Sequence, residues 1–278
     1  MRLVRKVGQA KRIVENVRKK GHTVGLVPTM GFLHEGHLSL VRMARNKCDY
    51  LVVSVFVNPT QFGPREDLRR YPRNLRRDLR LLRNEGVDLV FNPSAKAMYP
   101  DGFKTYVEVT DWSKLLCGAS RPIHFRGVTT VVLKLFNILQ PDVAVFGRKD
   151  YQQSVIIKKM VKDLNLNVRI LTGRIVREPD GLAMSSRNTY LSKTQRKNAV
   201  VLYESLKWLR KAYIKGLRDP KLAENKIAMM IKNKQGKIDY IAIVDKNKLE
   251  PVKKLRKGTL AALAVFFGRT RLIDNTVL

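Results

Sequence analysis

Short apolar runs alternate with segments of helical periodicity through the first two-thirds of the chain. Runs rich in Val, Leu and Ile predict buried strands; they span residues 23–28, 50–57, 87–92, 143–146 and 168–171. Segments with apolar residues three or four positions apart predict helices; they span residues 38–47, 67–85, 128–139 and 151–164. This alternation predicts an α/β fold, a Rossmann-like doubly wound parallel sheet with right-handed crossovers.

The pattern changes after about residue 172. A long helical pattern covers 193–216 and a second covers 220–234, and apolar strand patterns follow at 238–244 and 260–267. Helices followed by strands, without regular alternation, predict a smaller α+β domain. We therefore expect two domains, 1–173 and 174–278.

Composition narrows the class of protein. With 278 residues and 44% hydrophobic side chains, the chain can bury a sizeable core, which excludes a disordered protein. No apolar run reaches the roughly 18 to 20 residues that span a bilayer, and the basic segment 1–21 lacks a signal-peptide core. We expect a soluble cytoplasmic protein. Two cysteines, Cys48 and Cys117, are too few for a disulfide framework or a zinc site.

The charge is strongly basic: 55 Lys and Arg face 23 Asp and Glu, a formal net charge of +32. Such a protein attracts polyanions, so nucleic-acid binding is one alternative. However, the basic residues are spread along the chain, as in 65–83, 158–177 and 246–257, without a zinc-finger, RRM or KH pattern. We favour solvated basic faces and expect no specific nucleic-acid partner.

Two of the four histidines, His34 and His37, lie three residues apart where the strand 23–28 gives way to a helix. On a first helical turn this spacing puts both imidazoles on one side. A helix N-terminus favours phosphate, and Gly36 removes a side chain where a ligand must approach. The pair alone also allows a metal site or a general base.

Two further polar turns, 58–63 and 147–150, follow predicted strands. In parallel sheets, ligands bind beyond the carboxyl ends of the strands. The three turns together therefore predict a ligand site at one edge of the sheet.

The stretch 34–37 (HEGH) resembles the His-x-Gly-His signature of the nucleotidylyltransferase superfamily. Further motifs resemble the pantoate–β-alanine ligase family over nearly the whole chain. They are 28–31 (PTMG), 58–63 (NPTQFG), 71–73 (YPR), 121–122 (RP), 124–125 (HF), 146–147 (FG), 149–153 (KDYQQ), 180–188 (DGLAMSSRN) and 271–275 (RLIDN).

The resemblance implies a two-step ligation. The carboxylate of pantoate attacks the α-phosphate of ATP, giving pantoyl adenylate and pyrophosphate; the amine of β-alanine then displaces AMP. It also implies Mg²⁺ bound to the ATP phosphates, an ATP- and pantoate-binding domain at 1–173, a lid domain at 174–278, and a homodimer.

The resemblance also assigns roles to residues. Catalytic roles fall to His37, His34, Lys149 and Arg187. ATP contacts fall to Met30, Gly31, His34, His37, Gly147, Arg148, Lys149, Asp150, Val176, Met184, Ser185, Ser186 and Arg187. Contacts to pantoate or β-alanine fall to Gln61, Gln153, Met30, Asn58, Tyr71 and Arg121, and Asp78 is expected near a Mg²⁺ held mainly by ATP.

Four positions depart from the family pattern, which usually has an acid at Arg77, Glu at Cys117, Gly at Ile123 and Glu or Gln at Arg148. We expect the fold and the site to be kept, with Arg77 weakening a Mg²⁺ site and Arg148 adding positive charge beside ATP. Another nucleotidylyltransferase, or a charge-altered variant of the same fold with weak activity, remains the alternative.

Overall fold

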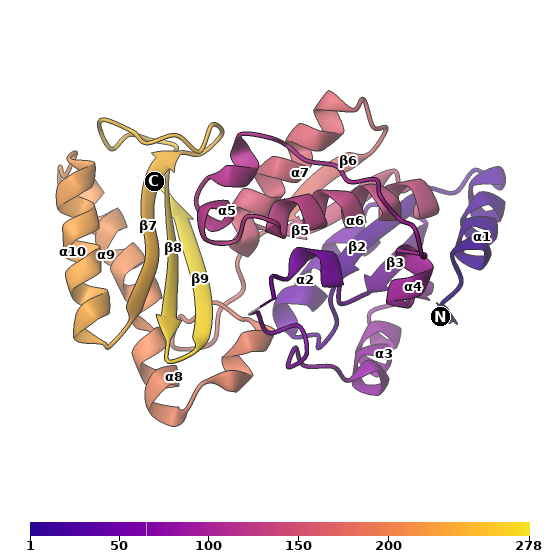
Figure 1. Cartoon of the computed structure of the whole chain (residues 1–278), viewed down its shortest axis with the longest axis horizontal. Helices are drawn as coiled ribbons and strands as arrows, with labels where there is room; N and C mark the ends of the chain where they lie inside the picture. The colour runs from indigo at the N-terminus through magenta and orange to yellow at the C-terminus, as the bar shows by residue number, and fades with distance from the viewer. Residues whose placement is uncertain (65) are drawn as a thin grey trace. The chain divides into compact units, whose positions relative to one another are not determined.

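The structure, a computed structural model, describes residues 1–64 and 66–278 and divides into two compact units (Figure 1). The first unit comprises Met1–Ser113, Arg121–Arg148 and Gln153–Arg174. The second comprises Lys114–Ser120, Lys149–Gln152 and Ile175–Leu278. The predicted domain division between residues 173 and 174 stays a prediction.

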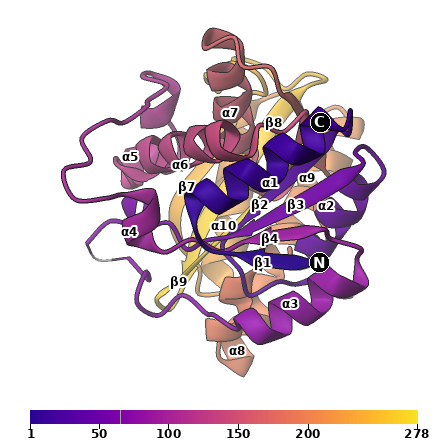
Figure 2. The same ribbon diagram turned by 90° about the vertical axis from the view of Figure 1, so that its right-hand side faces the viewer.

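The first unit is built on a six-stranded parallel sheet in the order β1-β4-β3-β2-β5-β6. Its strands are β1 (Arg2–Val4), β2 (Val24–Thr29), β3 (Tyr50–Val55), β4 (Leu89–Phe91), β5 (Val143–Gly147) and β6 (Arg169–Gly173). Figure 2 shows β1, β4, β3 and β2 side by side. From β2 the order runs one way through β3 and β4 and the other way through β5 and β6, so the switch point lies between β2 and β5.

Helices cover both faces of this sheet, because successive strand residues point to opposite sides. Leu26 belongs to a core formed with helices α1, α6 and α7, whereas Val27 belongs to a core formed with α2 and α3. The helices are α1 (Val7–Lys19), α2 (Glu35–Arg45), α3 (Leu75–Asn84), α4 (Ala95–Met98), α6 (His124–Leu139) and α7 (Tyr151–Asp163), with short 3-10 helices η1 (Pro59–Gln61), η2 (Trp112–Lys114) and η3 (Arg148–Asp150). Lys114 of η2 and residues 149–152 of η3 and α7 belong to the second unit.

The second unit contains a three-stranded antiparallel sheet in the order β7-β8-β9. Its elements are α5 (Cys117–Ser120), η4 (Ser186–Tyr190), α8 (Lys193–Ala199), α9 (Val201–Ile214), α10 (Pro220–Asn233), β7 (Lys237–Asp245), β8 (Thr259–Phe267) and β9 (Thr270–Val277). Leu206 of α9, Ile227 of α10 and Leu263 of β8 are fully or almost fully buried in its core. In the described part of the chain, no helix combines the length and apolarity needed to cross a membrane.

The predicted fold class is confirmed, and each predicted strand is present with its ends shifted by a few residues. The helix predicted over 67–85 is wrong in its first part: α3 begins only at Leu75 because Asn74 caps it, accepting from the N–H of Arg77 at 3.0 Å. The helix predicted over 193–216 is two helices, α8 and α9, that meet at Val200. Sequence reasoning missed β1, α1 and β9, although α1 carries apolar residues at helical spacing.

A close backbone approach fixes the turn η1 against α6. A methyl group added at Gly127 of α6 would lie 2.4 Å from the carbonyl oxygen of Thr60 and 2.6 Å from Cα of Gln61. Only glycine permits this approach, so Gly127 sets the position of the turn that carries Gln61.

We predict that Gly127→Ala destabilises the protein by about 1–3 kcal/mol, because backbone must move to admit the methyl group. The matched control is Gly8→Ala in α1, where an added methyl group meets nothing within 4 Å. Urea unfolding measures both. Equal stability of the two variants would contradict the close approach.

Candidate active site

Three polar segments follow three neighbouring strands of the first unit. The segment 30–37 follows β2, Asn58 and η1 follow β3, and Gly147 ends β5. Because the strands are parallel and adjacent, their carboxyl ends lie at one edge of the sheet, at the switch point. The predicted convergence of the three turns is therefore present in the topology.

His34 and His37 form a reciprocal cap at the start of α2. Nδ1 of His34 accepts from the N–H of Gly36 at 3.1 Å, and Nδ1 of His37 accepts from the N–H of His34 at 3.3 Å. Their ring centroids are 4.1 Å apart. Since both Nδ1 atoms accept, each neutral ring carries its proton on Nε2, which makes that nitrogen the donor. Two adjacent N–H donors suit a phosphate.

The backbone between β2 and α2 is tightly bound. The N–H of Gly31 donates to Oγ1 of Thr29 at 3.2 Å, and those of Phe32 and Leu33 each donate to a carboxylate oxygen of Asp78 at 2.8 Å. Gly31 and Phe32 both have positive φ, 83° and 50°. The ATP contact expected of Gly31 stays a prediction; its N–H group already has an intramolecular acceptor.

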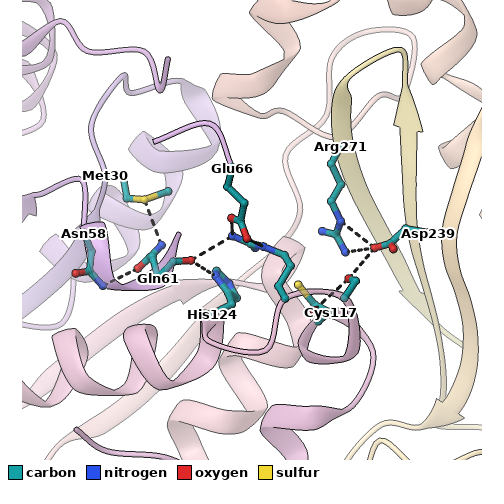
Figure 3. Close-up of polar contacts among 10 residues, drawn as sticks. Met30, Asn58, Gln61, Glu66, Cys117, His124, Asp239 and Arg271 are labelled. Atoms are coloured by element: carbon teal, nitrogen blue, oxygen red, sulfur yellow. Dashed lines mark hydrogen bonds and ion pairs between the residues drawn. The ribbon is translucent and has the colours of Figure 1, made fainter. Parts of the chain in front are cut away.

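Met30, Asn58 and Gln61 are brought together, as Figure 3 shows. The side-chain oxygen of Gln61 accepts from Nδ2 of Asn58 at 3.1 Å, and its Nε2 lies 3.3 Å from Sδ of Met30. Asn58 is held in turn by the hydroxyl of Tyr99 at 2.8 Å. Burial raises the pKa of Tyr99 to about 12, so this hydroxyl stays a donor. Sequence reasoning missed Tyr99.

Arg121 supports the Gln61 turn. Its Nη2 donates to the carbonyl oxygen of Gln61 at 3.3 Å, and its guanidinium forms a two-pronged ion pair with Glu66 (Figure 3). Nδ1 of His124 lies 3.0 Å from the same carbonyl, which can only accept, so this nitrogen carries the proton. Glu66 was not among the predicted residues, and His124 was predicted only as part of a motif.

Two other predicted substrate contacts lie in the first unit. Tyr71 is buried and packs edge-on against Phe62, with ring centroids 6.1 Å apart. Gln153 is half-buried on α7, whereas its neighbour Gln152 is buried and binds the segment 115–117, through the carbonyl of Leu115 at 2.7 Å and the N–H of Cys117 at 3.1 Å.

The second unit carries the other predicted ATP residues. Nδ2 of Asn275 donates to the carbonyl of Lys149 at 2.8 Å, and Nζ of Lys149 lies 3.2 Å from the Asp150 carboxylate. Met184 donates its N–H to the carbonyl of Val176 at 3.0 Å. Oγ of Ser185 accepts from the N–H of Arg187 at 3.3 Å, which caps η4 and turns Ser186 inward.

Strand β9 anchors this segment. Asp274, 2% exposed, pairs with Arg177 through two contacts of 2.6 and 2.9 Å, and Arg177 also donates to the carbonyl of Gly181 at 3.0 Å. Asp274 thus holds, through Arg177, the backbone that precedes the signature 184–187, and Asn275 holds the backbone of Lys149. The resemblance included residues 271–275 without giving them a role. The contacts of Asp274 and Asn275 indicate that they hold the backbone of other segments in place.

The departures from the family pattern lie in different environments. Cys117 is a buried cysteine on α5, whereas Arg148 and Ile123 are exposed. Near α5, Ser120 and Arg271 both donate to the Asp239 carboxylate, at 3.0 and 2.7 Å (Figure 3). Arg77 lies on α3 and donates to the carbonyl of Leu33 at 2.7 Å.

No group of three or more His, Cys, Asp or Glu side chains suited to a metal ion occurs among residues 1–64 and 66–278. Asp78, expected near Mg²⁺, is 1% exposed and uses both oxygens on backbone N–H groups. This environment suits a loop anchor better than a direct Mg²⁺ ligand; its place near Mg²⁺ stays a prediction.

The doubly wound sheet, the capped imidazole pair at its switch point and the amide cluster beside it define an α/β enzyme suited to a phosphate-bearing substrate. The sequence model described as Pantoate-beta-alanine ligase matches residues 2–277. The chain belongs to this family, whose members are ligases that form a C–N bond.

Similar proteins agree over full length. The pantothenate synthetase of Thermotoga petrophila is 54% identical over 100% of both chains, and that of Acetivibrio thermocellus is 56% identical over 100% of this chain and 99% of its own. A crystal structure of the pantothenate synthetase from Thermus thermophilus has a TM-score of 0.95 at 44% identity, covering 100% and 99% of the two chains. The Francisella tularensis ligase, complexed with β-γ ATP and β-alanine, has a TM-score of 0.84 at 38% identity, covering 100% and 97%.

The Glu66–Arg121 pair gives a pH prediction. Burial raises the pKa of Glu66, but the hydrogen bonds and charge of Arg121 outweigh it and hold the pKa below the ordinary 4.5. The pair therefore stabilises the fold above pH 4.5, and this stabilisation is lost as the pH falls through the lower pKa of the folded state.

We predict that Glu66→Gln lowers the free energy of unfolding by about 1–2 kcal/mol at pH 7, and that the deficit shrinks below pH 4.5. Urea unfolding between about pH 3 and 7 measures this, with Glu15→Gln on the exposed side of α1 as the control. A deficit independent of pH would show that packing, and not the ion pair, is responsible.

Proposed function

We propose that the chain joins pantoate to β-alanine, using ATP and passing through pantoyl adenylate. In the first step a carboxylate oxygen of pantoate forms a bond to the α-phosphorus, and the bond from that phosphorus to pyrophosphate breaks. In the second, the neutral amine of β-alanine attacks the acyl carbon, the acyl C–O bond breaks, AMP leaves, and the nitrogen loses a proton. No covalent enzyme intermediate is required.

The observation that carries this proposal is the meeting of two chemistries at neighbouring strand ends. The Nε2 donors of His34 and His37 suit phosphate oxygens, and the side-chain amides of Gln61 and Asn58, packed beside the Met30 thioether, suit the hydroxyls and carboxylate of a small acid. Holding the two anions in line and neutralising charge at the phosphate would supply most of the catalysis. His37 is the group best suited to donate to the reacting phosphate.

The second unit would contribute the remaining ATP contacts. Asp150 would accept from a ribose hydroxyl and Lys149 would bind phosphate, while Ser185, Ser186 and Arg187 would bind the β- and γ-phosphates. The fixed backbones of Lys149 and of the 184–187 signature support these roles, since a prearranged donor loses less entropy on binding. We further propose an ATP- and pantoate-binding domain at 1–173 and a lid domain at 174–278.

Two expectations complete the proposal. Mg²⁺ would enter bound to the ATP phosphates and would reduce their repulsion of the pantoate carboxylate. The Francisella ligase complexed with β-γ ATP and β-alanine supports the nucleotide and the amine as substrates. The active species would be a homodimer, with no specific nucleic-acid partner.

The test is an assay of the purified protein with pantoate, β-alanine, ATP and Mg²⁺, following AMP, pyrophosphate and the amide product. We expect AMP and amide in equal amounts, and pyrophosphate exchange into ATP with pantoate alone. Amide formed together with ADP would contradict an adenylate, and no product from a folded protein would contradict the ligation.

We predict that His37→Asn slows adenylate formation about 100-fold, because it removes the Nε2 donor from the reacting phosphate. The asparagine oxygen can still accept the cap bond from the N–H of His34, so melting temperature should hardly change. Pyrophosphate exchange and thermal unfolding measure the two effects. His22→Asn, at an exposed histidine, is the control; equal rates for the two variants would remove His37 from the mechanism.

We predict that Gln61→Ala raises the KM for pantoate about 10-fold or more, because a small acid loses a hydrogen-bonding partner in a buried site. The KM for ATP should stay within about twofold. Steady-state kinetics of this variant and of Gln9→Ala, at an exposed position, measure both. A parallel rise for both substrates would mean that Gln61 only supports the fold.

A further inference from the structure

The loop that carries the histidine pair is held by an element distant in sequence. Four successive N–H groups, from Gly31 to His34, have intramolecular acceptors. The outer two acceptors, Thr29 and His37, belong to the loop and its flanking elements. The middle two are the oxygens of Asp78, which lies on α3, 46 residues from Phe32 and 45 from Leu33.

Burying the carboxylate of Asp78 to satisfy two N–H groups costs free energy. Its side chain is 1% exposed, and burial raises the pKa of its carboxyl although the two backbone bonds and Arg77 oppose this. A buried carboxylate is unfavourable unless its bonds are well made. Both bonds are 2.8 Å long, so the carboxylate fixes two successive peptide groups at once.

Arg77 binds the same loop through a backbone carbonyl and an aromatic ring. Its Nη1 donates to the carbonyl of Leu33 at 2.7 Å, and its guanidinium lies 5.4 Å from the centroid of the Phe32 ring. The pattern that the chain resembles usually has an acid at this position. A carboxylate cannot donate to a carbonyl, so the hydrogen bond to the carbonyl of Leu33 depends on the arginine of this chain.

The contacts of Asp78 and Arg77 act on backbone with an unfavourable conformation. Phe32 has a φ of 50°, a conformation that a non-glycine side chain adopts at a cost. A methyl group on Gly31 would lie 3.1 Å from Oδ2 of Asp78 and 3.0 Å from the Val55 side chain. The loop therefore has little room to adopt another path while α3 stays in place.

We propose that Asp78 and Arg77 are positioning residues that fix loop 31–34 and thereby aim the His34 and His37 imidazoles at the nucleotide phosphate. This inference rests on the proposed function. His34 directly follows Leu33, which Asp78 and Arg77 both bind. A shift of the loop therefore moves both rings, because each histidine ring is hydrogen-bonded to the backbone at the start of α2. A displacement of about 1 Å in such a group is enough to cost on the order of 100-fold in rate.

The test uses the full chain with four variants. Asp78→Asn replaces one acceptor oxygen by a donor in nearly the same volume, and Arg77→Met removes the carbonyl bond. Arg77→Lys keeps a donor and should restore part of the effect. Arg76→Met, on the exposed face of the same helical turn, loses the same charge and is the matched control.

Two readouts are independent. Amide hydrogen exchange, followed by mass spectrometry without substrate, should be about 10-fold faster at residues 31–34 in Asp78→Asn and Arg77→Met than in the control. Pyrophosphate exchange should be about 10- to 100-fold slower in the same two variants, while the KM for β-alanine in the overall reaction stays within about twofold.

The proposal would be overturned if Asp78→Asn and Arg77→Met both showed the same amide hydrogen exchange and the same pyrophosphate exchange rate as Arg76→Met. A loss of rate in Arg77→Met that comes with a lower melting temperature and unchanged exchange in the loop would also overturn it, because this result means a structural role only. If Asp78→Asn does not fold, the two variants of the half-exposed Arg77 still test the proposal through amide exchange and pyrophosphate exchange. A wild-type protein that makes no AMP refutes the ligation, whereas amide exchange still decides whether the two residues hold the loop.

Discussion

The arrangement of the first unit's site depends on one constraint: the backbone that leaves β2 must satisfy its N–H groups while it turns sharply into α2. Asp78 supplies two of the acceptors, and the histidines supply two more, to Gly36 and to His34 itself. Because each imidazole uses Nδ1 on the backbone, its proton lies on Nε2, and Nε2 is the atom that can donate to a ligand. The chemistry of the pair is thus set by the geometry of the turn.

The same logic explains where the few acids lie in a chain of net charge +32. At the opposite edge of the sheet, Asp49 accepts from the N–H of Thr23, Asp142 from Val24 and Asp88 from Leu51, at 2.7 to 2.8 Å. These three acids serve backbone donors at strand ends, while many cations lie on exposed faces such as that of α3. The excess charge is therefore compatible with an ordered fold.

Much of the fold could be predicted because the central strands β2, β3, β4 and β5 are buried on both faces and read as continuous apolar runs. The turns that follow them could be placed for the same reason, and the histidine spacing pointed to a helix start. Strand β9 could not be predicted, since its buried Asp274 and Asn275 interrupt the apolar pattern. The residues that support the site were harder to predict. Asp78 was expected near Mg²⁺ but not as an acceptor for loop N–H groups, and Glu66, Tyr99 and Gly127 were not predicted, because all four act through partners that only the fold brings close. A sequence pattern carries periodicity and local spacing, but not such pairings.

The most direct measurement follows oxygen atoms through the reaction. Pantoate labelled with heavy oxygen in its carboxylate is turned over with ATP and β-alanine, and the AMP is analysed by mass spectrometry. Attack of the carboxylate on the α-phosphate, followed by displacement of AMP by the amine, predicts one labelled oxygen in each AMP. Unlabelled AMP, or label in inorganic phosphate, would contradict the adenylate and with it the role given to the histidine pair.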